Sequence, residues 1–566
     1  MVEQHFNLIT QSWIKVIDKE NKEQEVSLEE LFKNIADYRQ LAGEMKTQDL
    51  AIMRFLLAIL TAVYSRCDFA GNIYDGLEVD RNTFEVLDVT QNPREYELET
   101  WKTLYQKGHF SPVLIDYLKT YSNEFDLFDR ETPFYQVTRE EYDKLVPENK
   151  VVSKGKGTVA IKQMRRTISE SNNSKAIFSP VATEKMDRVS LGELVRWLIT
   201  YQNFTGVTDK TKINSEEKFA ASKGWLYSIS PVFAQGKDLF DTLMLNLILG
   251  DEDGYKDQIP VWEFDRDTYI EDRLNGTVPN NRAEIYTNWS RVLHIEWKDN
   301  QPMIFTAALP GFELSGNNIE EVEPMTTWKF DKKTNTYRPE SQYLGSLNKA
   351  MWRNFGHYIK VESQAKSDQK IPGIVIWLQF LKKEKILSKD RYISLSSVAM
   401  VSDGNATSQS PAAEFIDGMK INVAVLFDDD KTRAWPVRIE DMVDLTQKVG
   451  SYYYKFTQNV ATFRNLSSKS EFASEQSAIF YERINQPFLD WLASLDIEQL
   501  QTEKLNEWKK EVDSIARDVA NNLLQDASPH DFQLKKIQVG KNKEDKENIF
   551  TYYQRFILQI HHVLAS

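Results

Sequence analysis

The order of hydrophobic and polar positions divides the chain into two parts. Beyond residue 430, hydrophobic residues recur at steps of three and four, a spacing that places them on one face of a helix. Residues 438–461 and 470–496 show this pattern, the second with an interruption at Pro487. The pattern returns in two further series, Leu505, Trp508, Val512, Ile515, Val519 and Leu523, and Ile549, Tyr552, Tyr553, Phe556, Ile560 and Val563. These amphipathic segments predict a four-helix bundle over residues 431–566.

Residues 1–430 combine helical and strand-like patterns. Residues 48–66 are apolar on every side, which is typical of a buried helix, and residues 372–387 have the pattern of a short amphipathic helix. The strand-like stretches lie between and after these helices. The predicted fold class is therefore α+β, with a large mixed N-terminal domain over residues 1–430 followed by a C-terminal four-helix bundle over residues 431–566.

Four stretches of the first part predict strands. Residues 260–300 contain PVWEF and EIYTNWSRVLHIEW with turns between them, and residues 393–409 run from a strand into a polar turn. INVAVLF at 421–427 is expected to be a closing strand. WKFDKKTNTYRP at 328–339 predicts a hairpin, because aromatic residues frame the polar turn of residues 331–335.

Composition indicates a large soluble protein. The chain has 566 residues, too many for one core, and its content of 41% hydrophobic and 12% aromatic residues is typical of globular proteins. Cys67 is the only cysteine, which excludes an internal disulfide and a cysteine-rich zinc site, and its apolar surroundings predict a buried thiol. The N-terminus lacks a signal-peptide pattern, and the apolar run Phe55–Tyr64 is too short to span a bilayer. We expect a cytoplasmic protein without membrane contact.

The charge is acidic overall but basic in places. There are 70 basic and 84 acidic residues, a net charge of −14, which disfavours a freestanding nucleic-acid binder. The hairpin at 328–339 departs from this balance, because four basic residues face Asp331 alone: Lys329, Lys332, Lys333 and Arg338.

A second basic segment covers residues 150–183, where Glu170 is the only acidic residue. Its basic residues are Lys150, Lys154, Lys156, Lys162, Arg165, Arg166 and Lys175. Two interpretations remain open: a solvated surface loop, or a loop that contacts nucleic acid through its phosphates.

The sequence shows no catalytic motif. The dipeptide His530-Asp531 is the kernel of metal-dependent phosphohydrolases, but the other histidines lack the spacing of metal ligands around it. A helix cap or a shaped loop is the favoured interpretation. We therefore expect no enzyme activity, no catalytic residues, no cofactor and no metal.

Several stretches, in order along nearly the whole chain, resemble one family. They are FNLITQSWIKVI with VSLEELF, LFDRETPFYQV at 127–137, KDLFDTLMLNLI at 237–248, IPVWEF at 259–264, IYTNWSRVLHIEW at 285–297 and EPMTTWKF at 323–330. Together with the C-terminal helices, they resemble the CasA family, the large subunit of the type I-E CRISPR surveillance complex called Cascade.

The resemblance implies a non-catalytic role in antiviral defence. Such a subunit recognises the protospacer-adjacent motif (PAM) in double-stranded DNA, helps to open the duplex and recruits the helicase-nuclease effector, while the guide RNA reads the target sequence. The implied partners are other Cascade subunits, the 5′ handle of the CRISPR guide RNA, double-stranded target DNA and the helicase-nuclease effector. Two alternatives remain: a scaffold protein without direct DNA contact, and a metal-dependent phosphohydrolase that uses His530-Asp531.

The resemblance also implies two elements that face the minor groove of DNA. A lysine finger matches Lys329, with Lys332 or Lys333 as the tip if the register slips. A slim cation suits the minor groove, which is narrow and concentrates negative potential. The family's glycine loop corresponds to a region with a single glycine, and the DNA-binding residues implied there are Asn203, Thr205, Gly206 and Thr208.

Two further elements follow from the resemblance. A wedge that separates the first base pair corresponds to a polar turn with Gly404, Asn405, Ala406 and Gln409, in which the pair 405–406 is the best match. A loop that contacts the guide's 5′ handle and the motif region lies in the basic segment 150–183. The RNA- or DNA-contacting residues implied there are Lys162, Arg165, Arg166, Phe178 and Ser179.

Overall fold

The computed structural model describes most of the chain and divides it into two units. The described residues are 5–165, 182, 185, 188–206, 208–227, 229–250, 254–299, 301–341, 349–359, 368–402, 411–430, 434–467, 471–538 and 544–565. The mixed unit comprises Met1–Leu347, Asp368–Leu378 and Leu395–Asp417, and the helical unit comprises Asn348–Ser367, Gln379–Ser394 and Gly418–Ser566.

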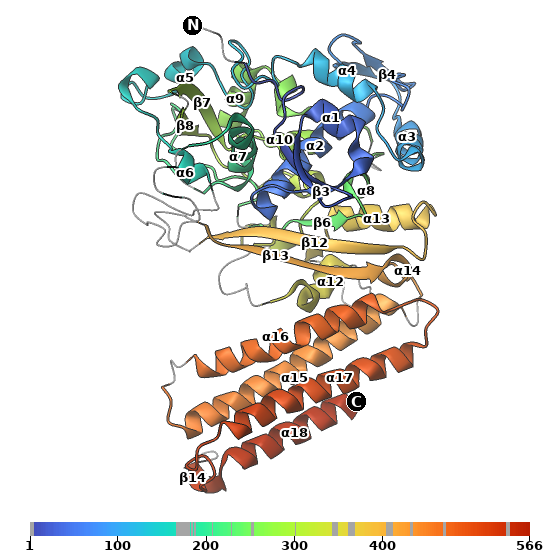
Figure 1. The fold of residues 1–566 in the computed structure, drawn as a ribbon, viewed down its shortest axis with the longest axis vertical. Coiled ribbons are helices and arrows are strands. Elements are labelled where there is room, and N and C mark those ends of the chain that lie inside the picture. Colours follow the sequence, from blue (N-terminus) through green and yellow to red (C-terminus); the bar gives the residue numbers. More distant parts are fainter. Residues whose placement is uncertain are drawn as a thin grey trace. The chain divides into compact units, whose positions relative to one another are not determined.

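The mixed unit combines short helices with small sheets, as its alternating patterns predict (Figure 1). Its helices are α1 (Leu28–Lys33), α2 (Lys46–Tyr64), α3 (Arg94–Lys107), α4 (Val113–Thr120), α5 (Arg139–Leu145), α6 (Ile161–Met164), α7 (Leu191–Phe204), α8 (Leu239–Asn246), α9 (Arg266–Leu274), α10 (Arg282–Thr287) and α11 (Ile319–Val322). Its strands are β1 (Ile14–Asp18), β2 (Glu23–Val26), β3 (Tyr38–Leu41), β4 (Leu77–Val79), β5 (Val86–Val89), β6 (Val232–Gln235), β7 (Arg291–Lys298), β8 (Gln301–Ala308), β9 (Trp328–Asp331), β10 (Thr336–Pro339) and β11 (Gln369–Lys370). The chain passes between the units within α13 (Gly373–Lys383), β12 (Tyr392–Ser402) and β13 (Pro411–Asn422).

The strands form separate small sheets rather than one large sheet. Strand orders among the described residues are β2-β1-β3, β10-β9-β11 and β13-β12-β6, with the pairs β4-β5 and β7-β8. The long hairpin β7-β8 pairs Arg291 with Ala308 at one end and Lys298 with Gln301 at the other. Strand β12 confirms the strand predicted for the start of 393–409.

Helix α2 forms the core of the mixed unit and confirms the buried helix predicted for residues 48–66. It packs against α7 and α10, and the side chains of nearly all its residues are buried. Among the described residues, α2 is long and apolar enough to cross a bilayer, but 94% of that stretch is buried inside the protein, as expected for a core helix. Its buried cation, Arg54, pairs with Glu323 at 2.7 Å and lies over the ring of Tyr286. These contacts offset the free-energy cost of removing the charge from water.

The thiol of Cys67 is buried, as the sequence predicts. Burial raises the pKa of this thiol to about 12.

Two of the strand predictions are wrong in part. Most of residues 260–290 is helical, since Asp265 and Asn281 cap α9 and α10 with their side chains, and the strand β7 begins only at Arg291. Within 421–427, Asn422 accepts hydrogen bonds from the backbone N–H groups of residues 424 and 425, and α14 (Val423–Leu426) replaces the expected strand. In each case a side-chain cap outweighs the apolar pattern.

The helical unit is dominated by long C-terminal helices that run alongside one another (Figure 1). The helices of this unit are α12 (Phe355–Tyr358), α14, α15 (Trp435–Phe463), α16 (Phe472–Ala493), α17 (Gln501–Gln525) and α18 (Ile549–Ala565), and the strands β14 (Lys535–Gln538) and β15 (Glu544–Glu547) pair before α18. Helix α16 continues through Pro487, where the pattern predicted an interruption.

The buried face of α17 follows the predicted series closely. Trp508, Val512, Val519 and Leu523 are buried, whereas Leu505 and Ile515 are only half-buried. The Trp508 indole N–H donates to Thr446 of α15 at 2.9 Å, and its ring packs edge-on against Phe488 of α16. The buried ring of Trp508 and the hydrogen bond of its indole N–H therefore link α15, α16 and α17.

Candidate nucleic-acid interface

The predicted hairpin at 328–339 is confirmed as strands β9 and β10. The register places Trp328 opposite Pro339 and Phe330 opposite Tyr337, whose rings lie 5.2 Å apart. Trp328 is buried, and Lys329, the next residue, is exposed, as the alternation of a strand requires. Strand β11 pairs with the other edge of β9, so the hairpin is held on a sheet.

The turn of the hairpin has a local explanation. Asp331 accepts a hydrogen bond from the backbone N–H of Lys333 at 2.9 Å, which, together with the turn's other contacts, lowers the pKa of that carboxyl. Asn335 has a φ of 54°, a left-handed conformation that asparagine tolerates better than most residues. Lys332 and Lys333 are thereby presented at the exposed end of a constrained turn.

Most charges of the hairpin are already paired. Lys329 contacts Glu340 at 2.6 Å, Lys332 contacts Asp368 at 2.9 Å, and Arg338 contacts Asp331 at 3.1 Å. These carboxylates offset the local excess of positive charge. Within the part of the chain that the structure describes, Lys333 is the hairpin lysine without a carboxylate partner.

The residues of the predicted glycine loop lie mostly inside the mixed unit. Asn203 and Thr205, at the end of α7, are 2% and 0% exposed, and Gly206 is buried too. Thr208 is partly exposed and bonds the hydroxyl of Tyr201. In this conformation Thr208 is the residue of this group whose side chain reaches the surface.

A second glycine explains why this segment is fixed. The backbone N–H of Gly224 donates to the carbonyl of Thr205 at 2.8 Å, and Leu226 donates to Asn203 at 2.9 Å. A Cβ at Gly224 would lie 2.3 Å from the carbonyl carbon of Asn203. Gly224, which sequence reasoning missed, therefore permits the close backbone contact that fixes residues 203–205.

The basic segment 150–183 is only partly described. Arg165 is buried and forms an ion pair with Glu193 of α7, with its Nε 2.7 Å from the carboxylate, so it anchors the segment. Lys162 is half-buried. Lys154 and Lys156 are exposed. The predicted contact residues Arg166, Phe178 and Ser179 lie outside the described residues.

The predicted wedge also lies outside the described residues. Gly404, Asn405, Ala406 and Gln409 fall between the described parts of β12 and β13. The prediction for these four residues stays a prediction.

In the His530-Asp531 dipeptide, the carboxylate of Asp531 is held by hydrogen bonds from nearby residues. Both carboxylate oxygens of Asp531 accept hydrogen bonds from Arg464, and Ser528 donates to the same carboxylate at 3.0 Å. These contacts outweigh burial and lower the pKa of Asp531. In the described residues no group of three or more His, Cys, Asp or Glu is placed to hold a metal ion.

Sequence reasoning missed the partners of the lysines, Glu340 and Asp368. Glu340 could have been found, because it lies diagonally across from Lys329 in the hairpin register. Asp368 could not, because it reaches Lys332 from a segment 36 residues away, through the pairing of β11 with β9.

Comparison with known proteins identifies the fold. The crystal structure of Thermobifida fusca Cse1 has a TM-score of 0.76 to this chain at 20% identity, covering 99% of this chain and 98% of that chain. One chain of a structure described as a CRISPR RNA-guided surveillance complex has a TM-score of 0.68 at 14% identity, covering 98% of this chain and 99% of that chain. The fold is that of a CRISPR-associated protein.

The family follows from the sequence. The family model described as CRISPR-associated protein Cse1 matches residues 7–519, and the chain belongs to this family. A protein named CRISPR-associated protein CasA/Cse1, from Thermus thermophilus, is 23% identical over 261 residues, which are 46% of this chain and 42% of that protein. The chain thus matches less than half the length of this curated relative in sequence. The resemblance to the CasA family is confirmed.

Proposed function

We propose that this chain is the large, non-catalytic subunit of a type I-E RNA-guided surveillance complex, and that its β9-β10 hairpin contacts the PAM in double-stranded DNA. Membership of the Cse1 family and the likeness to a chain of a surveillance complex support the first part. The second part, the contact of the hairpin with the PAM, rests on the exposed lysines of its constrained turn.

The pairing pattern favours Lys333 as the tip of the finger. Lys329 would have to leave Glu340, and Lys332 would have to leave Asp368, before either could meet DNA with a full charge. Lys333 has no such contact among the described residues, and its side chain stands on the turn rather than on the strand. A single cation at the end of a narrow hairpin fits the width and the negative potential of the minor groove.

The remaining parts of the proposal rest on family membership alone. They are the opening of the duplex by residues 404–409, contact with the guide's 5′ handle, recruitment of a helicase-nuclease and a location in the cytoplasm. The net charge of −14 supports one further point: the chain by itself should bind duplex DNA weakly and with a steep dependence on salt.

The test uses a surveillance complex reconstituted with guide RNA and this chain. Binding of duplexes with and without the motif is measured for the parent and for Lys329→Ala, Lys332→Ala and Lys333→Ala. Lys333→Ala should weaken binding of motif DNA by roughly 5- to 10-fold, the lower end of the 1–3 kcal/mol that one good base contact contributes. It should also reduce the salt slope, the slope of log K for DNA binding against the logarithm of the salt concentration, by about one unit. Assembly of the complex should stay intact.

The matched control is Lys22→Ala, which removes an exposed lysine from the turn between β1 and β2 of the same unit. Equal binding by Lys22→Ala and by all three hairpin variants would rule out the motif-reading role of the hairpin. If Lys329→Ala alone lost motif binding, the register proposed for the tip would be wrong.

One observation favours the scaffold alternative, namely that two of the three hairpin lysines are neutralised in this structure. A complex assembled without this chain distinguishes the two functions. Loss of motif-dependent binding on omission of the chain, together with normal binding by all lysine variants, would favour a scaffold. The phosphohydrolase alternative gains no support, because Asp531 is held by Arg464 and Ser528.

A further inference from the structure

Strands β4 and β5 form a small antiparallel sheet at the periphery of the mixed unit (Figure 1). No third strand pairs with this sheet among the described residues. A two-stranded sheet is only marginally stable by itself, and packing of its apolar side chains against another surface stabilises it.

The exposed hydrophobic side chains of the mixed unit gather at this sheet. In the described part of residues 1–347, three large hydrophobic side chains are exposed, by 56%, 43% and 44%: Leu87, Val89 and Tyr96. Val89 lies opposite Leu77, the backbone N–H of Leu77 donates to Tyr74, and the ring of Tyr74 stacks on that of Tyr96. The three side chains therefore belong to one continuous part of the surface. Exposed apolar side chains gathered in one place mark an interaction site.

The surface around these side chains is acidic. Residues 75–99 contain eight acidic and two basic side chains. Glu78 of β4 lies directly opposite Asp88 of β5, and neither has a cation partner in the described structure. Like charges directly opposite one another destabilise a sheet, so a cation brought by an occupant would stabilise this one. The β4-β5 surface comprises the following residues: Leu77, Glu78, Leu87, Asp88, Val89 and Tyr96.

A hollow of about 500 Å³ continues this surface beyond the end of β4. Tyr74 and Tyr96 form its aromatic side, and Asp75 and Glu99 also line it. Asp75 accepts a hydrogen bond from the hydroxyl of Tyr96 at 3.3 Å, and Glu99 is exposed. Aromatic faces beside carboxylates accommodate a lysine or arginine side chain.

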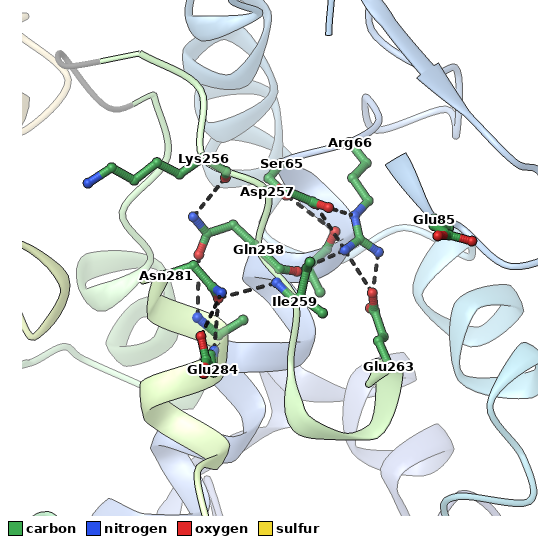
Figure 2. A network of polar contacts seen from close by, with 12 residues as sticks. Ser65, Arg66, Glu85, Lys256, Asp257, Gln258, Ile259, Glu263, Asn281 and Glu284 are labelled. Atoms are coloured by element: carbon green, nitrogen blue, oxygen red, sulfur yellow. Dashed lines mark hydrogen bonds and ion pairs between the residues drawn. The ribbon is translucent and has the colours of Figure 1, made fainter. Parts of the chain in front are cut away.

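The turn between β4 and β5 is fixed to the interior of the mixed unit. Phe84, in this turn, packs edge-on against Tyr117 of α4 at 5.5 Å. Tyr117 donates a hydrogen bond to Glu263. Glu263 pairs with Arg66 at 2.8 Å, in the network that Figure 2 shows, where the same guanidinium contacts Asp257. The β4-β5 surface is thereby held in one conformation, which lowers the entropic cost of binding to it.

The charge of the β4-β5 surface excludes two kinds of occupant. A nucleic acid would bring its phosphates against the carboxylates. A second copy of this chain would, in a two-fold contact, place the acidic surface against itself. A basic occupant with hydrophobic side chains matches the surface in both respects.

We propose that the β4-β5 surface binds a segment of a partner protein in which hydrophobic side chains are flanked by lysine or arginine. The hydrophobic side chains cover Leu87 and Val89, and the cations lie beside the carboxylates of Glu78 and Asp88. The surface shares no residue with the β9-β10 hairpin. The proposal is therefore independent of the proposed DNA contact.

The experiment measures binding of short designed peptides to the full chain at physiological salt by fluorescence anisotropy. The first peptide combines leucine and lysine in an amphipathic pattern, the second has serine in place of every leucine, and the third has glutamate in place of every lysine. The leucine-lysine peptide should bind at least about 10-fold more tightly than either of the others, a difference of about 1.4 kcal/mol. Equal binding of the leucine-lysine and serine-lysine peptides would reduce the contact to general charge attraction and overturn the proposal.

Hydrogen exchange locates the bound peptide. Addition of the leucine-lysine peptide should slow exchange of the backbone amides within residues 75–99. Protection confined to other parts of the chain would overturn the assignment of the surface.

Variants test the two kinds of contact separately. Leu87→Ser and Asp88→Asn should each weaken binding of the leucine-lysine peptide about 3- to 10-fold. Because Asp88→Asn removes the repulsion from Glu78, it should not lower the melting temperature, so its weaker binding is separated from any loss of folding. The matched controls are Leu558→Ser, which removes a leucine that is 69% exposed on α18, and Glu140→Gln, which removes an exposed carboxylate from α5. An equal loss of binding in the controls would overturn the site.

Discussion

Helix α17 and the β9-β10 hairpin show two different relations between sequence and structure. In α17 the spacing of hydrophobic residues predicts most of the buried side chains, and Trp508 at the centre of the series is 0% exposed. In the hairpin the alternation correctly exposes Lys329, yet the charge it presents depends on Glu340. The spacing of hydrophobic residues along a helix predicts which side chains are buried. Whether a lysine is free to bind DNA depends on the carboxylates that the fold places beside it.

The largest expected effect tests the helical side of this comparison. Trp508→Ala should lower the free energy of unfolding by roughly 3–5 kcal/mol, because it leaves a cavity between three helices and removes the hydrogen bond from the indole to Thr446. Chemical denaturation measures this. Glu507→Ala, at the adjacent exposed position, should change stability by less than about 0.5 kcal/mol. A similar loss of unfolding free energy in both variants would show that the hydrophobic spacing does not identify the residues of α17 that stabilise the fold.

The next prediction sharpens the contrast with a buried carboxyl that hydrogen bonds hold in place: Glu284 of α10. Burial raises the pKa of Glu284 to about 7, although its Oε2 accepts hydrogen bonds from Asn280 and Asn281. The folded state then holds a proton that the unfolded state releases at the ordinary glutamate pKa of 4.5. The free energy of unfolding therefore falls as pH rises from the unfolded-state pKa through about 7.

Glu284→Gln should remove this dependence and make the variant roughly 2–3 kcal/mol more stable than the parent at pH 8, with little difference at pH 4. The glutamine oxygen can still accept both hydrogen bonds. Urea denaturation across this pH range measures the difference, with Glu271→Gln, at an exposed position of α9, as the control. Parallel stability curves for parent and Glu284→Gln would contradict the raised pKa.

A third prediction extends the comparison to the segment that ends α7. Gly224→Ala should cost roughly 1–3 kcal/mol, because its Cβ collides with the backbone of Asn203 and disrupts the hydrogen bond to Thr205. Gly311→Ala is the matched control, since a Cβ there meets nothing within 4 Å and its φ is not in the left-handed region. If both alanines are tolerated equally, the segment 203–206 is not fixed by this contact.

The smallest expected effect returns to the hairpin. Glu340→Gln frees Lys329 from its ion pair, so the isolated chain should bind duplex DNA slightly more tightly, by less than about 1 kcal/mol. The salt slope should grow by about one unit. Glu20→Gln removes an exposed carboxylate from the turn between β1 and β2 and serves as the control. The same salt slope for Glu340→Gln and Glu20→Gln would mean that Lys329 does not contact DNA even without its ion pair.

The candidate site was only partly predictable from the sequence. The hairpin, its turn and the exposure of its lysines follow from the aromatic and polar order of residues 328–339. The burial of Asn203 and Thr205 does not, because it depends on Gly224, which approaches them from a loop about 20 residues away. The anchoring role of Arg165 likewise depends on Glu193, which lies on another helix.

The sequence by itself determined the mixed and helical character of the two parts, the buried helix α2, the face of α17 and the family resemblance, because each rests on periodic or ordered local signals. It failed at residues 260–290 and 421–427, where Asp265, Asn281 and Asn422 cap helices in apolar stretches. Only the tertiary structure decided which cations are paired, as it does for Lys329, Lys332 and Arg165. Those pairings arise when segments distant in sequence come within a few ångströms, and no local pattern encodes that approach.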